Sequence, residues 1–147
     1  MSRDELENLV AVGSLKRGGS SPREIAGLIA SGRARLHDAS NAALSPDSRF
    51  DLAYNAAHAL ALAALRHAGY RSDNRYVVFQ ALPHTLALGP RVWRVLSRAH
   101  DIRNMLEYEG AAEVDPRLLD DLLAAAAQVE QAVAVMDTSM PRPDGRG

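Results

Sequence analysis

The sequence predicts an all-α protein, a four- to five-helix up-down bundle, and two observations support this prediction. Of the 147 residues, 47% are hydrophobic but only 5% are aromatic, and Ala and Leu, which favour helices over strands, supply much of the apolar content. Xaa-Pro pairs at 21–22, 45–46, 89–90 and 115–116 each precede a stretch with helical apolar spacing. Proline suits the first helical position, and Ser or Asp before it can cap the free backbone N–H groups.

Four long helices are therefore expected. The first begins with Ser21 and Glu24 in the pattern of a capping box. The second is apolar nearly all round near its end, which predicts the most buried helix of the bundle. The fourth repeats apolar residues in steps of three and four, as helix–helix seams do. We expect these helices at residues of about 22–42, 46–68, 90–108 and 116–136.

Shorter elements are expected at the start and in the middle of the chain. Residues 3–12 are compatible with a short leading helix. The connector around Tyr76 to Leu82 favours a short helix that Pro83 closes, because no partner strand is visible in the sequence. The predicted organisation is an N-terminal short helix or arm over residues 1–20, a helical bundle over 21–137 and a disordered tail over 138–147.

Composition excludes several classes of protein. Lys plus Arg number 17 and Asp plus Glu number 18, a net charge of −1 that argues against a protein that coats DNA. The chain has no Cys, which rules out disulfides and thiolate metal sites, and the spacing of its five His residues predicts no metal site. No cofactor is expected. No stretch is long and apolar enough to cross a membrane, so we expect a cytoplasmic protein.

Arg103 interrupts the apolar stripe of the third long helix. It follows Leu96 by seven residues and Val92 by eleven, which places it within about 20° of both around the helix. Burying a lone charge costs several kcal/mol, so the guanidinium needs a partner, water or a subunit interface. The alternative is a purely structural role. Arg103 would then pair with a neighbouring helix, or its aliphatic stem would carry the guanidinium outward to solvent.

A polar strip lies at helical spacing near the start of the second long helix. It consists of Asp51, Tyr54, Asn55 and His58. If the second and third helices pack antiparallel, this strip faces the end of the third, and Asp51 could pair with Arg103. The alternative is that these polar groups satisfy one another or face solvent.

Basic residues also recur along the third helix at 91, 94 and 98. Such rows are usually solvated faces. This one ends at Arg98, close to Arg103 in the sequence, and could attract phosphates.

Two segments resemble the HEPN superfamily. They are RFDLAYNAAHALALAALRHAGYR at 49–71 and RNMLEYEG at 103–110. The resemblance extends from about residue 20 to residue 136. It implies a bundle of four or five helices, often a homodimer, and in many members a metal-independent ribonuclease with a motif of Arg, a polar residue and a later His.

The resemblance places this motif on Arg103, Asn104 and Tyr108. Tyr108 stands where the family has His. A free tyrosine, with a pKa of about 10, is poorly suited to proton transfer at neutral pH. His100 precedes Arg103 and so does not replace the missing His directly.

Three functions follow as hypotheses. The first is a binding or interaction module, the HEPN half of a toxin–antitoxin or defence pair with a minimal nucleotidyltransferase, which holds RNA or a nucleotide. Its binding residues would be Asp51, Tyr54, His58, Arg98, Arg103 and Asn104. The second is an endoribonuclease toxin that uses Arg103, Asn104 and Tyr108, with His58 or Tyr108 transferring protons. The third is a scaffold without a small ligand.

Overall fold

The computed structural model describes residues 3–109 and 114–138 of the chain, without the side chains of residues 107–109 and 138. The described residues form helices and one pair of very short strands, so the all-α prediction is confirmed. In chain order the elements are α1 (Arg3–Ala11), β1 (Lys16–Arg17), α2 (Pro22–Ala39), α3 (Pro46–His67), β2 (Tyr70–Arg71), α4 (Arg75–Gln80), α5 (Leu82–Thr85), α6 (Pro90–Glu109) and α7 (Pro116–Thr138).

Each long helix begins at its predicted proline, and the expected caps are present. The Ser21 and Ser45 hydroxyls accept the backbone N–H groups of the third residue after each, both at 3.1 Å. Asp115 Oδ1 accepts the backbone N–H of residue 117 at 2.9 Å. These bonds satisfy N–H groups that the first helical turn leaves open. Glu24 supplies only half of the capping box, because its carboxylate pairs with Arg71 at 3.6 Å.

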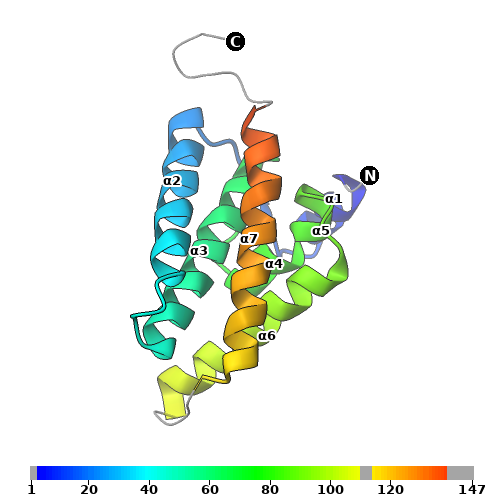
Figure 1. Ribbon diagram of the computed structural model, residues 1–147. Coiled ribbons are helices and arrows are strands. Elements are labelled where there is room, and N and C mark those ends of the chain that lie inside the picture. The colour runs from blue at the N-terminus through cyan, green and yellow to red at the C-terminus, as the bar shows by residue number, and fades with distance from the viewer. Residues whose placement is uncertain (1–2, 110–113, 139–147) are drawn as a thin grey trace.

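Helix α3 lies at the centre of the molecule. It packs most extensively against α2 and α7 and also contacts α4, α5 and α6. Figure 1 shows α2, α3 and α7 side by side along the length of the molecule, with α6 crossing obliquely, α1 and α5 at one side and α4 near the centre. Leu60 and Leu65 of α3 are fully buried, which confirms the prediction that this is the most enclosed helix.

The connector between α3 and α6 differs from its prediction. Its first helix, α4, ends at Gln80, and Pro83 lies in the first turn of the next helix, α5. The expectation that Pro83 closes a helix reaching Leu82 is therefore wrong. Proline lacks an N–H group, and the first turn of a helix is where that group is not required.

A two-residue antiparallel ladder joins the N-terminal segment to the end of α3. Lys16 pairs with Arg71, and Arg17 pairs with Tyr70. The sequence did not predict this ladder. It holds α1 and the segment after it against the helical body, where Leu6 and Leu15 join the buried core.

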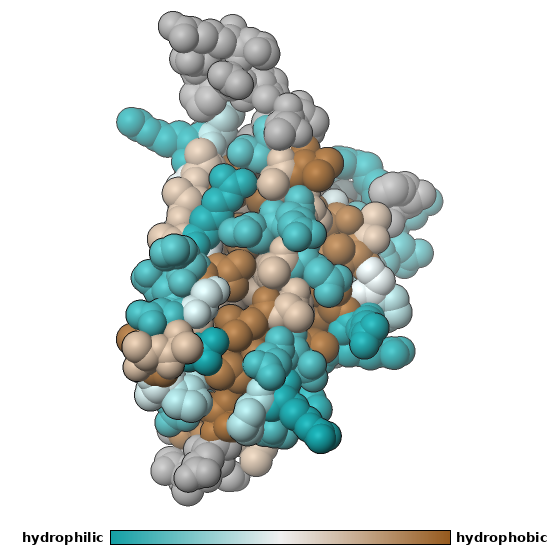
Figure 2. Space-filling model, viewed as in Figure 1, coloured by the Kyte–Doolittle hydropathy of each residue, from teal (hydrophilic) through white to brown (hydrophobic). Residues whose placement is uncertain are grey.

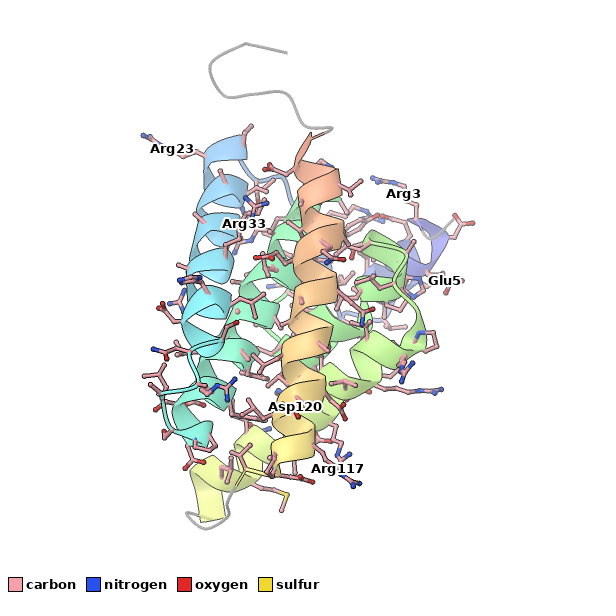
Figure 3. The ribbon with its side chains drawn as sticks, viewed as in Figure 1. Arg3, Glu5, Arg23, Arg33, Arg117 and Asp120 are labelled. Atoms are coloured by element: carbon pink, nitrogen blue, oxygen red, sulfur yellow. The ribbon has the colours of Figure 1, made fainter. Side chains whose placement is uncertain are left out.

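Charged side chains cover the outer faces of the long helices. Arg23 of α2 and Asp120 of α7 are exposed and point outward (Figure 3). The face that carries α7 shows hydrophilic side chains interrupted by smaller hydrophobic areas (Figure 2). Among the helices that the structure describes, none has the length and hydropathy needed to cross a membrane.

Candidate functional site

A group of polar and aromatic side chains gathers where α3, α4 and α6 pack against one another. We call it the polar cluster, and it consists of Tyr54, Arg75, His100, Arg103 and Asn104. Tyr54 comes from α3, Arg75 from the start of α4, and the other three from α6. Residues that are distant in sequence therefore meet at one point, and Arg103 is one of them, as its place in an apolar seam predicted.

Tyr54 is the centre of the polar cluster. Its side chain is fully buried, and its hydroxyl shares a hydrogen bond of 2.8 Å with His100 Nδ1. Two guanidinium groups lie over its ring, that of Arg103 at 5.1 Å and that of Arg75 at 5.5 Å from the centroid. Both distances suit cation–π attraction, which strengthens where the groups are partly shielded from water.

His100 is held through both ring nitrogens. Besides the bond to Tyr54, its Nε2 lies 3.4 Å from Asn104 Nδ2, one helical turn further along α6. The Tyr54 and His100 rings are stacked, with centroids 6.2 Å apart. The imidazole is therefore fixed in orientation, with one short polar contact and one long one.

Arg103 meets Asp51, the pairing that the sequence suggested for these two helices. Arg103 Nε lies 3.9 Å from Asp51 Oδ1, and the two side chains are 29% and 66% exposed. A long ion pair with so exposed a carboxylate contributes little to stability. The pair with Asp51 therefore contributes little to holding the Arg103 guanidinium in the α6 stripe.

Arg75 brings a second positive charge to the same place. Its Nη1 donates to Asn55 Oδ1 at 2.9 Å, and Asn55 Nδ2 donates to the Asp51 carbonyl one turn earlier on α3 at 2.9 Å. These bonds hold Arg75 against α3, and the residue as a whole stays partly exposed. Arg75 and Arg103 thus both lie over the Tyr54 ring, and Arg103 also pairs with Asp51.

His58 lies one turn beyond Tyr54 and faces the interior. Its ring meets Phe79 edge-on, with centroids 6.0 Å apart. Burial, followed by the charges of Arg75 and Arg66, lowers the pKa of His58 to about 4. His58 is thus neutral at physiological pH and forms part of the wall behind the cluster.

The remaining predicted site residues lie elsewhere or outside the described part of the chain. Arg98 is exposed on α6 and makes no hydrogen bond or ion pair with any described residue, so it does not join the cluster. The side chain of Tyr108 lies outside the described residues, as does the tail from residue 139. Among the described residues, no group of three His, Cys, Asp or Glu could hold a metal ion.

Sequence reasoning missed two members of the polar cluster, His100 and Arg75. A signal for His100 was present, because His100 and Asn104 stand four residues apart and therefore share a face of α6. Arg75 carried no such signal. Its position depends on how the connector after α3 folds back onto that helix.

Comparisons with known proteins identify no relative. No family model matches the chain, and the searches of curated proteins and of solved structures return no match.

Proposed function

We propose that the chain is a binding module whose polar cluster holds a phosphate group of single-stranded RNA. The observation that carries this proposal is the convergence of two guanidiniums, Arg75 and Arg103, on one buried ring. Guanidiniums bind phosphate through charge-assisted, often bidentate hydrogen bonds. Asn104 lies on the same helix as Arg103, and its amide can donate a further hydrogen bond to the same oxygens.

The weak ion pair with Asp51 supports the same proposal. A phosphate can replace an exposed carboxylate 3.9 Å away at little cost. Tyr54 orients the arriving group indirectly, because its ring fixes both guanidiniums and its hydroxyl fixes His100.

The wider biological setting is a proposal from sequence resemblance. We propose a HEPN-like up-down bundle that acts as a homodimer and as the partner of a minimal nucleotidyltransferase in a toxin–antitoxin or defence pair. Two features support this role. The polar cluster has residues that suit a phosphate, and Tyr108 stands at the motif position where the family has its catalytic His. A nucleotidyltransferase gene beside this one, and co-purification of the two products, would support it.

Replacing Arg103 tests the binding site. We expect Arg103→Ala to lower the affinity for a fluorescein-labelled 12-nucleotide single-stranded RNA roughly tenfold, the loss of one charge-assisted contact of about 1.4 kcal/mol. Fluorescence anisotropy at constant salt measures this affinity. The fold should survive, because Asp51 is mostly exposed and can be solvated once its partner is gone.

Two further variants separate a built site from general attraction. Arg33→Ala removes the same charge from an exposed position on α2, on its side towards α7 (Figure 3), and should change the affinity less than about twofold. Arg103→Lys keeps the charge but loses the planar fork, so its affinity should lie between those of Arg103→Ala and the unmodified protein. Equal losses in Arg33→Ala and Arg103→Ala would contradict the proposed site.

A second candidate function is metal-independent RNA cleavage. The observation that favours it is His100, an imidazole next to Arg103 and suited in type to proton transfer. His100 would have to release its contacts to Tyr54 and Asn104 before its ring could reach the RNA. RNA cleavage in EDTA that His100→Gln abolishes without loss of RNA binding would establish this function. If the protein binds RNA but shows no Arg103-dependent cleavage, the cleavage function is contradicted and the binding module is supported.

A further inference from the structure

The polar cluster continues along α6 into an aromatic surface. Trp93, His100 and Asn104 follow one another at intervals of seven and four residues, so they lie on one face of the helix. Trp93 is partly exposed. The same helical face therefore carries hydrogen-bonding groups near its end and an indole ring two turns earlier.

Tyr76 of α4 connects these two parts. Its ring meets Trp93 edge-on, with centroids 6.4 Å apart and planes at 82°, and lies 6.4 Å from the His100 ring. It immediately follows Arg75, a member of the polar cluster. The rings of Trp93, Tyr76, His100 and Tyr54 thus form a continuous row from the surface to the buried centre.

The exposure of Tyr76 is not explained by packing. Its side chain is 38% exposed, whereas Phe79, one turn later on the same short helix, is fully buried against Tyr54 and His58. Val77, Val78 and Phe79 are the residues that pack α4 against the core. Tyr76 and Trp93 leave aromatic surface in contact with water, within reach of a ligand held at Arg75.

We propose that Tyr76 and Trp93 form a stacking site for a nucleobase adjacent to the phosphate held by Arg75 and Arg103. This inference rests on the proposed function and deepens it. Flat aromatic rings beside cationic groups suit unpaired bases joined by phosphates, because every base has a π face. The bases of a double helix are already stacked on one another, so the ligand is single-stranded.

Trp93 reports on this site directly, because it is the only tryptophan in the chain. The probes are a uridine hexanucleotide and an abasic ribose-phosphate hexamer of equal charge. We expect the uridine probe to quench Trp93 emission and to bind roughly tenfold more tightly than the abasic probe. The abasic probe should bind through the polar cluster and leave the emission unchanged.

Variants assign the effect to the ring of Tyr76. Tyr76→Ala should weaken uridine hexamer binding roughly tenfold and leave abasic hexamer binding unchanged, whereas Tyr76→Phe should retain both. Leu44→Ala is the matched control, since Leu44 is 36% exposed and lies before α3, away from the aromatic row in sequence. It should alter neither affinity.

The failure of the stacking site and the failure of the proposed function give different results. If both probes bind equally and Tyr76→Ala has no effect, the stacking site is overturned while the phosphate site stands. If neither probe binds, both are overturned. If Tyr76→Ala dissociates a dimer and changes no RNA affinity, the aromatic surface is a contact between two copies and the stacking site is overturned.

Discussion

His58 gives the protein a pH-dependent stability at the scale of a single residue. Its pKa of about 4 in the folded chain lies below the value of about 6.5 for an exposed histidine. The unfolded chain therefore binds more protons between these two pH values. The stability that the neutral imidazole provides is complete above about pH 6.5 and is lost as the pH falls towards 4.

We expect this residue alone to lower the free energy of unfolding by about 2 to 3 kcal/mol between pH 7 and pH 4. Urea unfolding at several pH values measures the slope for the unmodified protein and for His58→Gln, which cannot gain the proton. The variant should be less stable at pH 7 and depend less on pH. His67→Gln, at an exposed position, is the control. An unchanged slope in His58→Gln would show that another group causes the dependence.

At this scale the sequence predicted the meeting of Arg103 with Asp51 and Tyr54 but not the complete cluster. A charge in an apolar helical stripe is visible as a break in periodicity, and the polar strip at residues 51–58 was the other visible break. Arg75 was not predictable, because its contact with Asn55 depends on the path of a connector whose direction no periodicity encodes. His100 was not predicted as a site residue because it precedes Arg103, whereas the motif of the resemblance has its His after the Arg.

At the scale of elements, the contact between α2 and α3 depends on one glycine. A Cβ added at Gly32 would lie 2.6 Å from Leu60 Cγ and 3.2 Å from the Ala56 carbonyl oxygen. Leu60 is fully buried, so its side chain is enclosed by neighbours in a close-packed core. The absence of a side chain at Gly32 is thus what allows these two helices to pack so closely.

Two glycines of α2 form a matched pair for testing this contact. Gly32→Ala should lower the free energy of unfolding by about 1 to 2 kcal/mol, because overpacking outweighs the gain in helix propensity. Gly27→Ala, whose added Cβ would meet nothing within 4 Å, should instead raise it by up to about 1 kcal/mol. Thermal and urea unfolding distinguish the signs. Equal stabilisation by both substitutions would contradict the close packing.

The elements themselves were predictable where local chemistry defines them. Proline and its capping residue mark the start of each long helix, and the structure confirms all four starts. The ends are marked less strongly: α2 was predicted to reach about residue 42 and stops at Ala39. The ladder between β1 and β2 could not be predicted. Two residues on each side carry no alternating pattern, and their pairing depends on the position of α1.

At the scale of the whole molecule, one buried core joins segments that the sequence analysis separated. The core extends from Leu6 of α1 to Val133 of α7 and includes Leu15. Residues 1–20 were predicted as a short helix or arm beside a bundle. Polar contacts reinforce their attachment, since Tyr70 donates a 2.5 Å hydrogen bond to Glu7, which also pairs with Arg17.

This shared core predicts that the N-terminal segment unfolds together with the rest of the described chain. Leu15 is 2% exposed, and Leu15→Ala should lower the free energy of unfolding by about 2 to 5 kcal/mol. Val12→Ala, at a residue that is 74% exposed, should change it by less than about 0.5 kcal/mol.

Urea unfolding followed by Trp93 emission and by far-UV circular dichroism gives two independent curves. Because α1 contacts α5, and α5 contacts both α3 and α6, both curves should shift together in Leu15→Ala. An unchanged Trp93 midpoint would instead show that the N-terminal segment detaches without disturbing the helices that carry the polar cluster.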